Sequence, residues 1–292
     1  MLLNASGCLD ALTAPDTARQ LDAFVTKTIT PLPREGNAPV RIAETEAGML
    51  NSIGLANPGR EAFLADVLPR LAELGPPIWV SVGGFSAVDY AETCRALAGR
   101  DEVACIELNL SCPNVDEAPE SAAEIVAACR REARLPLYAK LSPAVPDVGA
   151  LAQAVAAAGA DGLALVNTIR GLALDERLRP VLGTRTGGYS GPALKPIALA
   201  AVHAAFAATA LPIVGMGGVS TGRDALELIA AGASAVALGT VLFTDPDAPR
   251  RVRAELAQEL AQHGYGSVAE ARGAAHLVES AANVAADREA PV

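Results

Sequence analysis

Eight short apolar runs recur along the chain, and helical patterns separate the later ones. Each run has the near-continuous hydrophobicity of a strand that is buried on both faces. The runs cover residues 2–6, 23–29, 78–84, 105–111, 137–142, 162–168, 212–218 and 235–240. Residues 121–133, 147–159 and 222–232 have the Ala-rich and Leu-rich periodicity of helices, and they end at Gly or close to a Pro. Eight strands that alternate with helices predict an α/β fold, the (β/α)8 TIM barrel.

The 292-residue chain contains no linker, charge block or low-complexity tract that would divide it. Because (β/α)8 barrels of about 250 residues are common, the prediction is a single domain over residues 1–292. Residues 169–195 form a longer and more irregular segment, and we expect an elaborated loop on the face where barrel enzymes carry their sites. The Ala-rich and Glu-rich stretch after Arg250 predicts a helical C-terminal tail.

Charge and cysteine content narrow the classes of partner. A net charge of -10 disfavours nucleic acid and anionic membranes, because such a field repels their phosphates. The apolar runs are interrupted well before the length of about 20 residues that a membrane span needs. The chain has 5 cysteines, no CxxC pair and no signal peptide, which predicts reduced thiols and a cytoplasmic protein. A ligand set for structural zinc or an iron–sulfur cluster is missing as well.

Polar side chains stand at the C-terminal ends of the predicted strands. They are Ser6, Lys27, Ser81, Asn109, Cys112, Lys140, Asn167 and Thr168. A solvated loop residue is the commoner explanation for any one of them, but strand ends converge on one pocket in a barrel, so the joint pattern indicates a site. Lys27 and Lys140 each follow an apolar run, where a positive charge is costly unless an anion neutralises it. We therefore expect an anionic ligand.

Glycines end the last two predicted strands. Gly217 and Gly218 follow the seventh, and Gly239 with Thr240 follows the eighth. Such turns let backbone N–H groups approach a phosphate, although plain turns have the same composition. The sequence lacks GxGxxG and HExxH, and its histidines lie away from the predicted strand ends. These absences disfavour a Rossmann dinucleotide site, a metal site and a nucleophile that a histidine activates.

Ten motifs occur in order along the chain. They are "NASG", "VTKTIT", "PREGN", "ETEAGMLNSIGLANPG", "ELNLSCPN", "AKLSP", "VNT", "GGYSGPALKPIAL", "GMGG" and "LGT". On these motifs the chain resembles the class 1 dihydroorotate dehydrogenases, and "AGMLNSIGL" and "SGPALKP" look most like the NAD-linked class 1B catalytic subunit. The resemblance implies a barrel that holds FMN and oxidises dihydroorotate to orotate in de novo pyrimidine (UMP) biosynthesis.

Residue roles follow from the resemblance, motif by motif. The FMN contacts would be Ser6, Lys27, Thr28, Asn109, Lys140, Val166, Gly191, Gly217, Gly218, Gly239 and Thr240. The substrate contacts would be Lys27, Asn51, Ser52, Ile53, Gly54, Leu55, Asn109, Asn114, Asn167 and Thr168. Cys112 would be the catalytic base that takes the proton from C5, while the hydride at C6 passes to FMN. Asparagine amides suit such a ligand because they donate and accept hydrogen bonds without titrating.

The class 1B branch also implies an electron-transfer subunit that carries FAD and an iron–sulfur cluster. A homodimer or a heterotetramer would be the assembly. The absence of a cluster ligand set and a dinucleotide fingerprint from this chain is consistent with such a partner.

Other functions stay open at the level of sequence. The loop after Asn114, "VDEAPES", is short for the family, which keeps open a related flavin oxidoreductase that acts on another dihydropyrimidine, such as dihydrouracil. Asn114 argues against this alternative, because such an oxidoreductase typically carries His at the matching position. A flavin-free barrel lyase would use Lys140 to form a Schiff base. A degenerate barrel that binds a ligand without catalysis is the remaining alternative.

Overall fold

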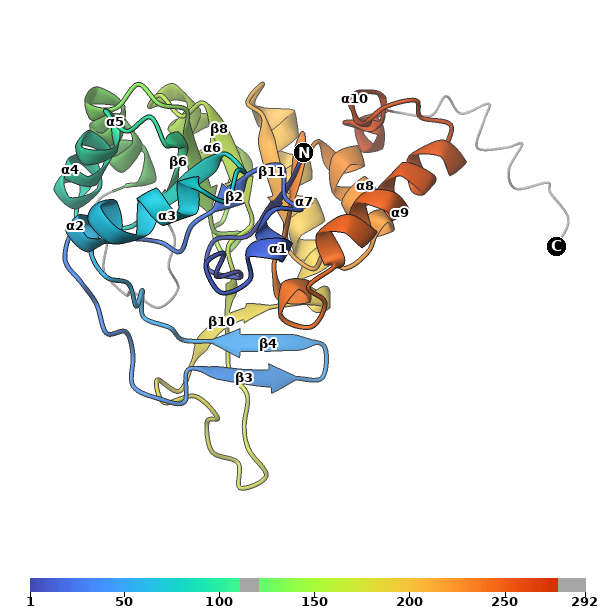
Figure 1. Cartoon of the computed structure of the whole chain (residues 1–292). Helices are drawn as coiled ribbons and strands as arrows, with labels where there is room; N and C mark the ends of the chain where they lie inside the picture. The colour runs from blue at the N-terminus through green and yellow to red at the C-terminus, as the bar shows by residue number, and fades with distance from the viewer. Residues whose placement is uncertain (111–120, 278–292) are drawn as a thin grey trace, which may run out of the picture.

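A closed parallel barrel forms the body of the protein (Figure 1). The computed structural model describes residues 1–110 and 121–277. Its strands are β1 (Leu2–Asn4), β2 (Phe24–Val25), β5 (Ile78–Val82), β6 (Val103–Asn109), β7 (Leu137–Leu141), β8 (Gly162–Leu165), β11 (Ile213–Met216) and β12 (Ala235–Leu238). The sheet order is β1-β12-β11-β8-β7-β6-β5-β2, and a parallel bridge between Leu3 and Ala23 joins its two edges. The predicted (β/α)8 barrel is confirmed, and its strands other than β6 are shorter than the apolar runs.

Helices surround the barrel on its outer side (Figure 1). The long ones are α4 (Ala87–Leu97), α5 (Ala122–Glu132), α6 (Val148–Ala157), α7 (Lys195–Ala208), α8 (Gly222–Ala231) and α9 (Ala248–Gln262). The short ones are α1 (Pro15–Ala18), α2 (Arg60–Ala62), the π-helix η1 (Phe63–Val67), α3 (Leu68–Ala72), α10 (Val268–Ala271) and the 3₁₀ helices η2 (Pro192–Leu194), η3 (Thr240–Phe243) and η4 (Ala274–His276). Ser121 and Thr221 begin α5 and α8 with capping boxes, which satisfy N–H groups that a helix start leaves free. The three helices predicted from the sequence are confirmed.

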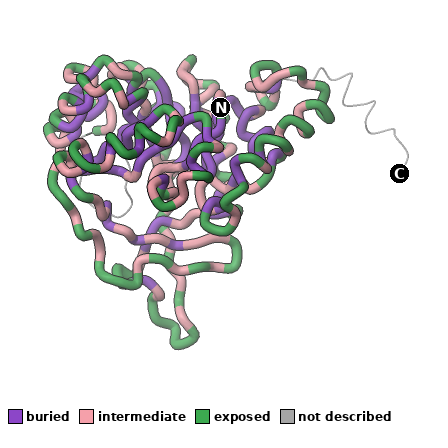
Figure 2. Tube along the Cα trace, viewed as in Figure 1, coloured by how far each residue is buried: buried purple, intermediate pink, exposed green. Residues whose placement is uncertain are grey.

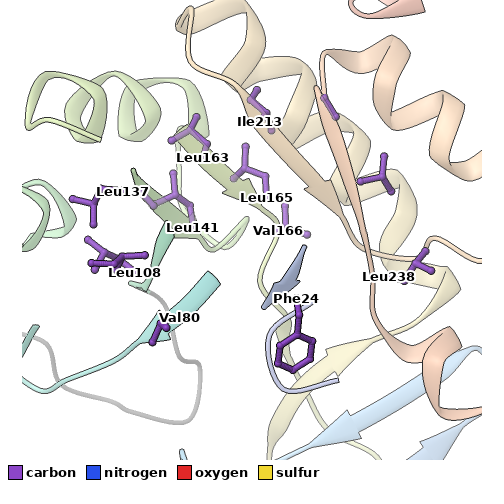
Figure 3. Close-up of a cluster of buried hydrophobic side chains, with 14 of the residues drawn as sticks. Phe24, Val80, Leu108, Leu137, Leu141, Leu163, Leu165, Val166, Ile213 and Leu238 are labelled. Atoms are coloured by element: carbon purple, nitrogen blue, oxygen red, sulfur yellow. The ribbon is translucent and has the colours of Figure 1, made fainter. Parts of the chain in front are cut away.

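Two apolar clusters fill the fold, and the alternation of residues along each strand separates them. Figure 3 shows Leu108, Leu137 and Leu163 on neighbouring strands, in the cluster that packs between the barrel and its helices. Cys105 belongs to the smaller cluster inside the barrel. Figure 2 shows the buried residues (purple) along the barrel and along the helices that pack on it. On β6 the residues in step with Cys105 therefore face inward, and these include Glu107 and Asn109.

One buried amide closes the barrel where its first two strands meet. Asn4 is fully buried, its Nδ2 donates to the carbonyl of Val25 at 2.7 Å, and its Oδ1 accepts from the N–H of Val25 at 2.8 Å. The side chain thus joins the end of β1 to β2.

Removal of this amide is expected to destabilise the barrel. Asn4→Ala leaves a buried N–H and a buried C=O of Val25 without partners, which should cost roughly 2–4 kcal/mol of unfolding free energy. Urea unfolding of the purified protein measures this loss. Gln153→Ala, which removes an exposed amide bonded to Ala208, is the control, with an expected change within about 0.5 kcal/mol. Equal effects of the two substitutions would contradict the prediction.

A second, antiparallel sheet lies across one end of the barrel (below it in Figure 1). It contains β3 (Ile42–Thr45), β4 (Gly48–Asn51), β10 (Gly187–Ser190) and β9 (Ile169–Gly171), in the order β3-β4-β10-β9. The sequence does not predict this sheet, because its strands are short and partly exposed, and three of them begin or end with glycine. Residues 169–195 are thus partly strand, and they pair with a hairpin from the other half of the chain.

Within residues 1–110 and 121–277, no helix combines the length and the hydropathy that a membrane crossing requires.

Candidate active site

A cavity of about 230 Å³ opens at the C-terminal ends of the barrel strands. Loops that follow the strands form its floor and walls, and the second sheet contributes Ile42, Met49 and Ser190. The cavity therefore lies between the barrel and the antiparallel sheet. This is the face on which (β/α)8 enzymes carry their active sites.

The structure brings most of the predicted site residues together around this cavity. All of the residues assigned to FMN line it: Ser6, Lys27, Thr28, Asn109, Lys140, Val166, Gly191, Gly217, Gly218, Gly239 and Thr240. From the substrate group, the lining includes Lys27, Asn51, Ile53, Gly54, Leu55, Asn109, Asn167 and Thr168. Cys112 and Asn114 lie outside the described residues. The roles of all these residues remain predictions.

Ser52 is the described member of the substrate group that does not line the cavity. It is buried, and its hydroxyl oxygen accepts hydrogen bonds from Asn37 Nδ2 at 2.8 Å and from Thr184 Oγ1 at 2.6 Å. Ser52 comes directly after β4 and turns its side chain to these two partners, whereas its neighbours Asn51 and Ile53 line the cavity. Through the bond with Thr184, the Ser52 side chain connects the end of β4 to the loop before β10.

A network of hydrogen bonds fixes the polar groups at the strand ends. Asn109 Nδ2 donates to Thr28 Oγ1 at 3.1 Å, and Asn109 Oδ1 accepts from Asn167 Nδ2 at 3.0 Å. Thr28 Oγ1 also lies 2.9 Å from the hydroxyl of Ser81, which is buried behind it. Tyr90 donates to the backbone carbonyl of Asn109 at 2.7 Å. The Asn109 side chain is thus held from both ends, and each end of its amide keeps capacity for one further hydrogen bond.

The lining of the cavity carries positive charge. Lys27 and Lys140 both contribute to it, and the described lining contains no acidic side chain. Lys140 is nearly buried, with 7% of its side chain exposed. A buried ammonium in such a lining favours an anionic or electron-rich ligand. The anion expected from the two lysines therefore has a place at which it can bind.

Cys8 is a second thiol near the site, and its chemistry differs from that expected of a base. It lines the cavity, and burial raises the pKa of its thiol, with Lys140 and Lys27 opposing that effect more weakly. The neutral thiol is therefore the stable form near neutral pH, in contrast to the reactive thiolate that base catalysis needs. This residue therefore packs beside the site rather than acting in it.

Two glycines allow a loop to approach the second sheet and the cavity. Gly191 has φ +119, and a Cβ there would lie 2.5 Å from the Cα of Gly48. Gly218 has φ +76, and a Cβ there would lie 2.8 Å from the backbone N of Lys195. Only glycine fits either position. The beginning of α7 and the turn after β11 can thus lie close together beside the cavity.

Several lining residues have no signal in the sequence. They are Ile42, Met49, Leu194, Met216, Val219 and Phe243. Their apolar side chains resemble ordinary core residues, and five of them come from the second sheet or from short helices and turns rather than from the barrel strands. Knowledge of which segments meet across the cavity would be needed to identify them.

Comparisons with known proteins agree with this geometry. A family model described as Dihydroorotate dehydrogenase matches residues 1–260. The chain is 47% identical over 264 residues to "Dihydroorotate dehydrogenase B (NAD(+)), catalytic subunit" of Desulforudis audaxviator (strain MP104C), an alignment that covers 88% of this chain and 86% of that protein. It is 47% identical over 253 residues to the protein of the same description in Latilactobacillus sakei subsp. sakei (strain 23K), covering 83% and 82%.

Structural comparison gives the same result. A crystal structure of DHODH from Eimeria tenella in complex with ferulenol superposes with a TM-score of 0.78 at 25% sequence identity, covering 95% of this chain and 85% of that one. A full-length fold match, a family model over most of the chain and relatives at 47% identity lead to one conclusion. The chain belongs to the dihydroorotate dehydrogenase family, and its curated relatives are class 1B catalytic subunits.

Proposed function

We propose that the protein oxidises dihydroorotate to orotate with FMN, in pyrimidine biosynthesis. The observation that carries the proposal is the cavity itself, in which Lys27 and Lys140 lie with the hydrogen-bonded amides of Asn109 and Asn167 and with no acid in the described lining. Dihydroorotate has a carboxylate, two carbonyls and two ring N–H groups. Cations and amides are the groups that recognise such a molecule.

The residues present fit FMN. Gly217 and Gly218 lie in a turn with positive φ angles at the end of β11, and Gly239 follows β12, so backbone borders the cavity where barrels commonly bind phosphate. Lys140 would offer an ammonium to an electron-rich edge of the ring system. Bound FMN would supply the acceptor for the hydride from C6 of the substrate.

The residues of the chain would bind and orient the substrate and accept its proton. Asn109 is bonded to Thr28 and to Asn167, so both side-chain amides are oriented before the ligand arrives. Lys27 would neutralise the substrate carboxylate. Cys112, two residues beyond the last described residue of that segment, would take the proton from C5.

A partner subunit would take up the electrons. The relatives are described as catalytic subunits of NAD(+)-linked enzymes, which supports a separate electron-transfer subunit for this chain. In the described part of the chain, His, Cys, Asp and Glu side chains do not form a group of three that could hold a metal. We infer that an FAD and iron–sulfur subunit binds this chain in a heterotetramer, and that the cytoplasm is its location.

Anaerobic addition of dihydroorotate is expected to bleach the yellow colour of the FMN-loaded protein, because substrate oxidation reduces the flavin. Flavin absorbance in a stopped-flow instrument measures the rate. Dihydrouracil at the same concentration is the control substrate, and it should be slower by about 10²-fold or more because it lacks the carboxylate that Lys27 would bind.

The other outcomes separate the alternatives. Faster bleaching by dihydrouracil would identify the related dihydropyrimidine oxidoreductase. A colourless protein that borohydride traps with a carbonyl substrate would identify a lyase that uses Lys140. Bound FMN that neither substrate reduces would contradict the proposed activity and leave a binding protein.

A further inference from the structure

Glu107 is a buried acid that the proposed reaction does not use. It lies on β6, two residues before Asn109, and faces the barrel interior without lining the cavity. Its side chain is 2% exposed. Among the buried residues of the described chain, Glu107 and Lys140 are the two that carry charge.

The carboxylate of Glu107 lies beside the ammonium of Lys140. Glu107 Oε1 is 3.6 Å from Lys140 Nζ, and Oε1 has no hydrogen-bond partner within residues 1–110 and 121–277. In the register of the barrel, Asn109 is opposite Lys140 and Glu107 is opposite Tyr138. Glu107 is therefore one layer deeper in the barrel than the cavity floor, below the lysine.

This arrangement is costly as a purely structural feature. A buried carboxylate loses the stabilisation of water, and an apolar side chain would fill the same space at a lower cost. A separation of 3.6 Å also exceeds the usual length of a charge-assisted hydrogen bond. The carboxylate therefore attracts the ammonium from below, and the N–H groups of Lys140 can still turn to a ligand in the cavity.

We propose that Glu107 is a positioning residue, which holds Lys140 at the cavity floor and offsets part of its charge toward a bound flavin. The inference rests on the proposed binding of FMN. Reduction adds electrons to the flavin, so a nearby ammonium favours the reduced form and a nearby carboxylate opposes it. Glu107 thereby lowers the reduction potential of the bound cofactor and determines how strongly Lys140 raises it.

Glu107→Gln tests this role because the amide keeps the shape and loses the charge. The ratio of reduced to oxidised FMN at a fixed potential should rise about tenfold, which is ~30 mV for a two-electron couple. Photochemical reduction with a reference dye measures this ratio without dihydroorotate. Glu107→Asp keeps the charge, so the reduction potential of its bound FMN should lie much closer to the wild-type value than to that of Glu107→Gln.

A second background shows whether Glu107 acts through Lys140. A Lys140→Gln protein has no ammonium for Glu107 to hold, so the further change Glu107→Gln should alter the ratio by less than about threefold. A tenfold change in both backgrounds would overturn the positioning role, because the carboxylate would then act independently of the lysine. An unchanged potential in Glu107→Gln protein with bound FMN would overturn the inference outright.

The order of measurements separates this inference from the proposed function. FMN affinity of the wild-type protein is determined first, by quenching of flavin fluorescence. A wild-type protein that does not bind FMN would overturn both. A protein that binds FMN, shows the expected shift in potential and is not reduced by dihydroorotate would contradict the proposed activity while supporting the role of Glu107.

Discussion

Cys112→Ala is expected to slow the reduction of bound flavin by dihydroorotate about 10²–10⁴-fold, with FMN affinity unchanged. The reason is that this substitution removes the proposed base for the C5 proton and leaves the cavity lining of the described residues intact. Stopped-flow bleaching under anaerobic conditions measures the rate, and fluorescence quenching measures FMN affinity. Most of the loss should be in kcat, because the thiol contributes little to binding.

Cys8→Ala is the matched control for this prediction. Cys8 is a thiol that lines the same cavity. Burial raises its pKa, so the thiol stays protonated near neutral pH and does not act as a base. Its replacement should change the bleaching rate less than about threefold, since no proton transfer depends on it. A similar loss in both variants would show that the cavity tolerates no change of volume, and normal bleaching in Cys112→Ala would show that another group is the base.

The barrel and the place of the site follow from local properties of the sequence. The strands within the apolar runs, such as the one around Leu163, are buried on both faces. Such a strand is recognised in the sequence as a continuous apolar run, without a pattern of alternating polar and apolar residues. Asn109, Lys140 and Thr168 lie at the C-terminal ends of such runs, so the convergence of strand ends in a barrel is enough to predict that they share a cavity.

The second sheet and the support of the site depend on contacts between distant segments. The β4 strand pairs with β10, and Thr28 touches Ser81 and Asn109, which lie 53 and 81 residues away. Neither strand has enough apolar residues to indicate a partner by itself. The role proposed for Glu107 cannot be predicted from the sequence for a similar reason. One acid in an apolar strand does not indicate its partner, and only the register of β6 with β7 shows that Lys140 lies beside it.

Asn109→Leu is expected to lower kcat/KM for dihydroorotate about 10²–10³-fold, because the leucine is close in size and cannot form the hydrogen bonds of the amide. The side chain of Asn109 joins Thr28 to Asn167, so its loss also removes one of the hydrogen bonds that orient the Asn167 amide in the proposed site. Unlike the loss of Cys112, this change should raise KM as well as lower kcat, since it removes binding and orientation together. Steady-state kinetics with an artificial electron acceptor separate the two terms.

Tyr90→Phe is the control that distinguishes orientation of the amide from general support of β6. The Tyr90 hydroxyl donates to the backbone carbonyl of Asn109, so its removal should cost about 1 kcal/mol of unfolding free energy and leave the amide in place. Its kcat/KM should then fall less than about fivefold, which is far below the effect of Asn109→Leu. Equal losses of activity would mean that the backbone position of Asn109, rather than the orientation of its amide, controls the reaction. A loss confined to kcat in Asn109→Leu would instead show that the amide acts only after the substrate is bound.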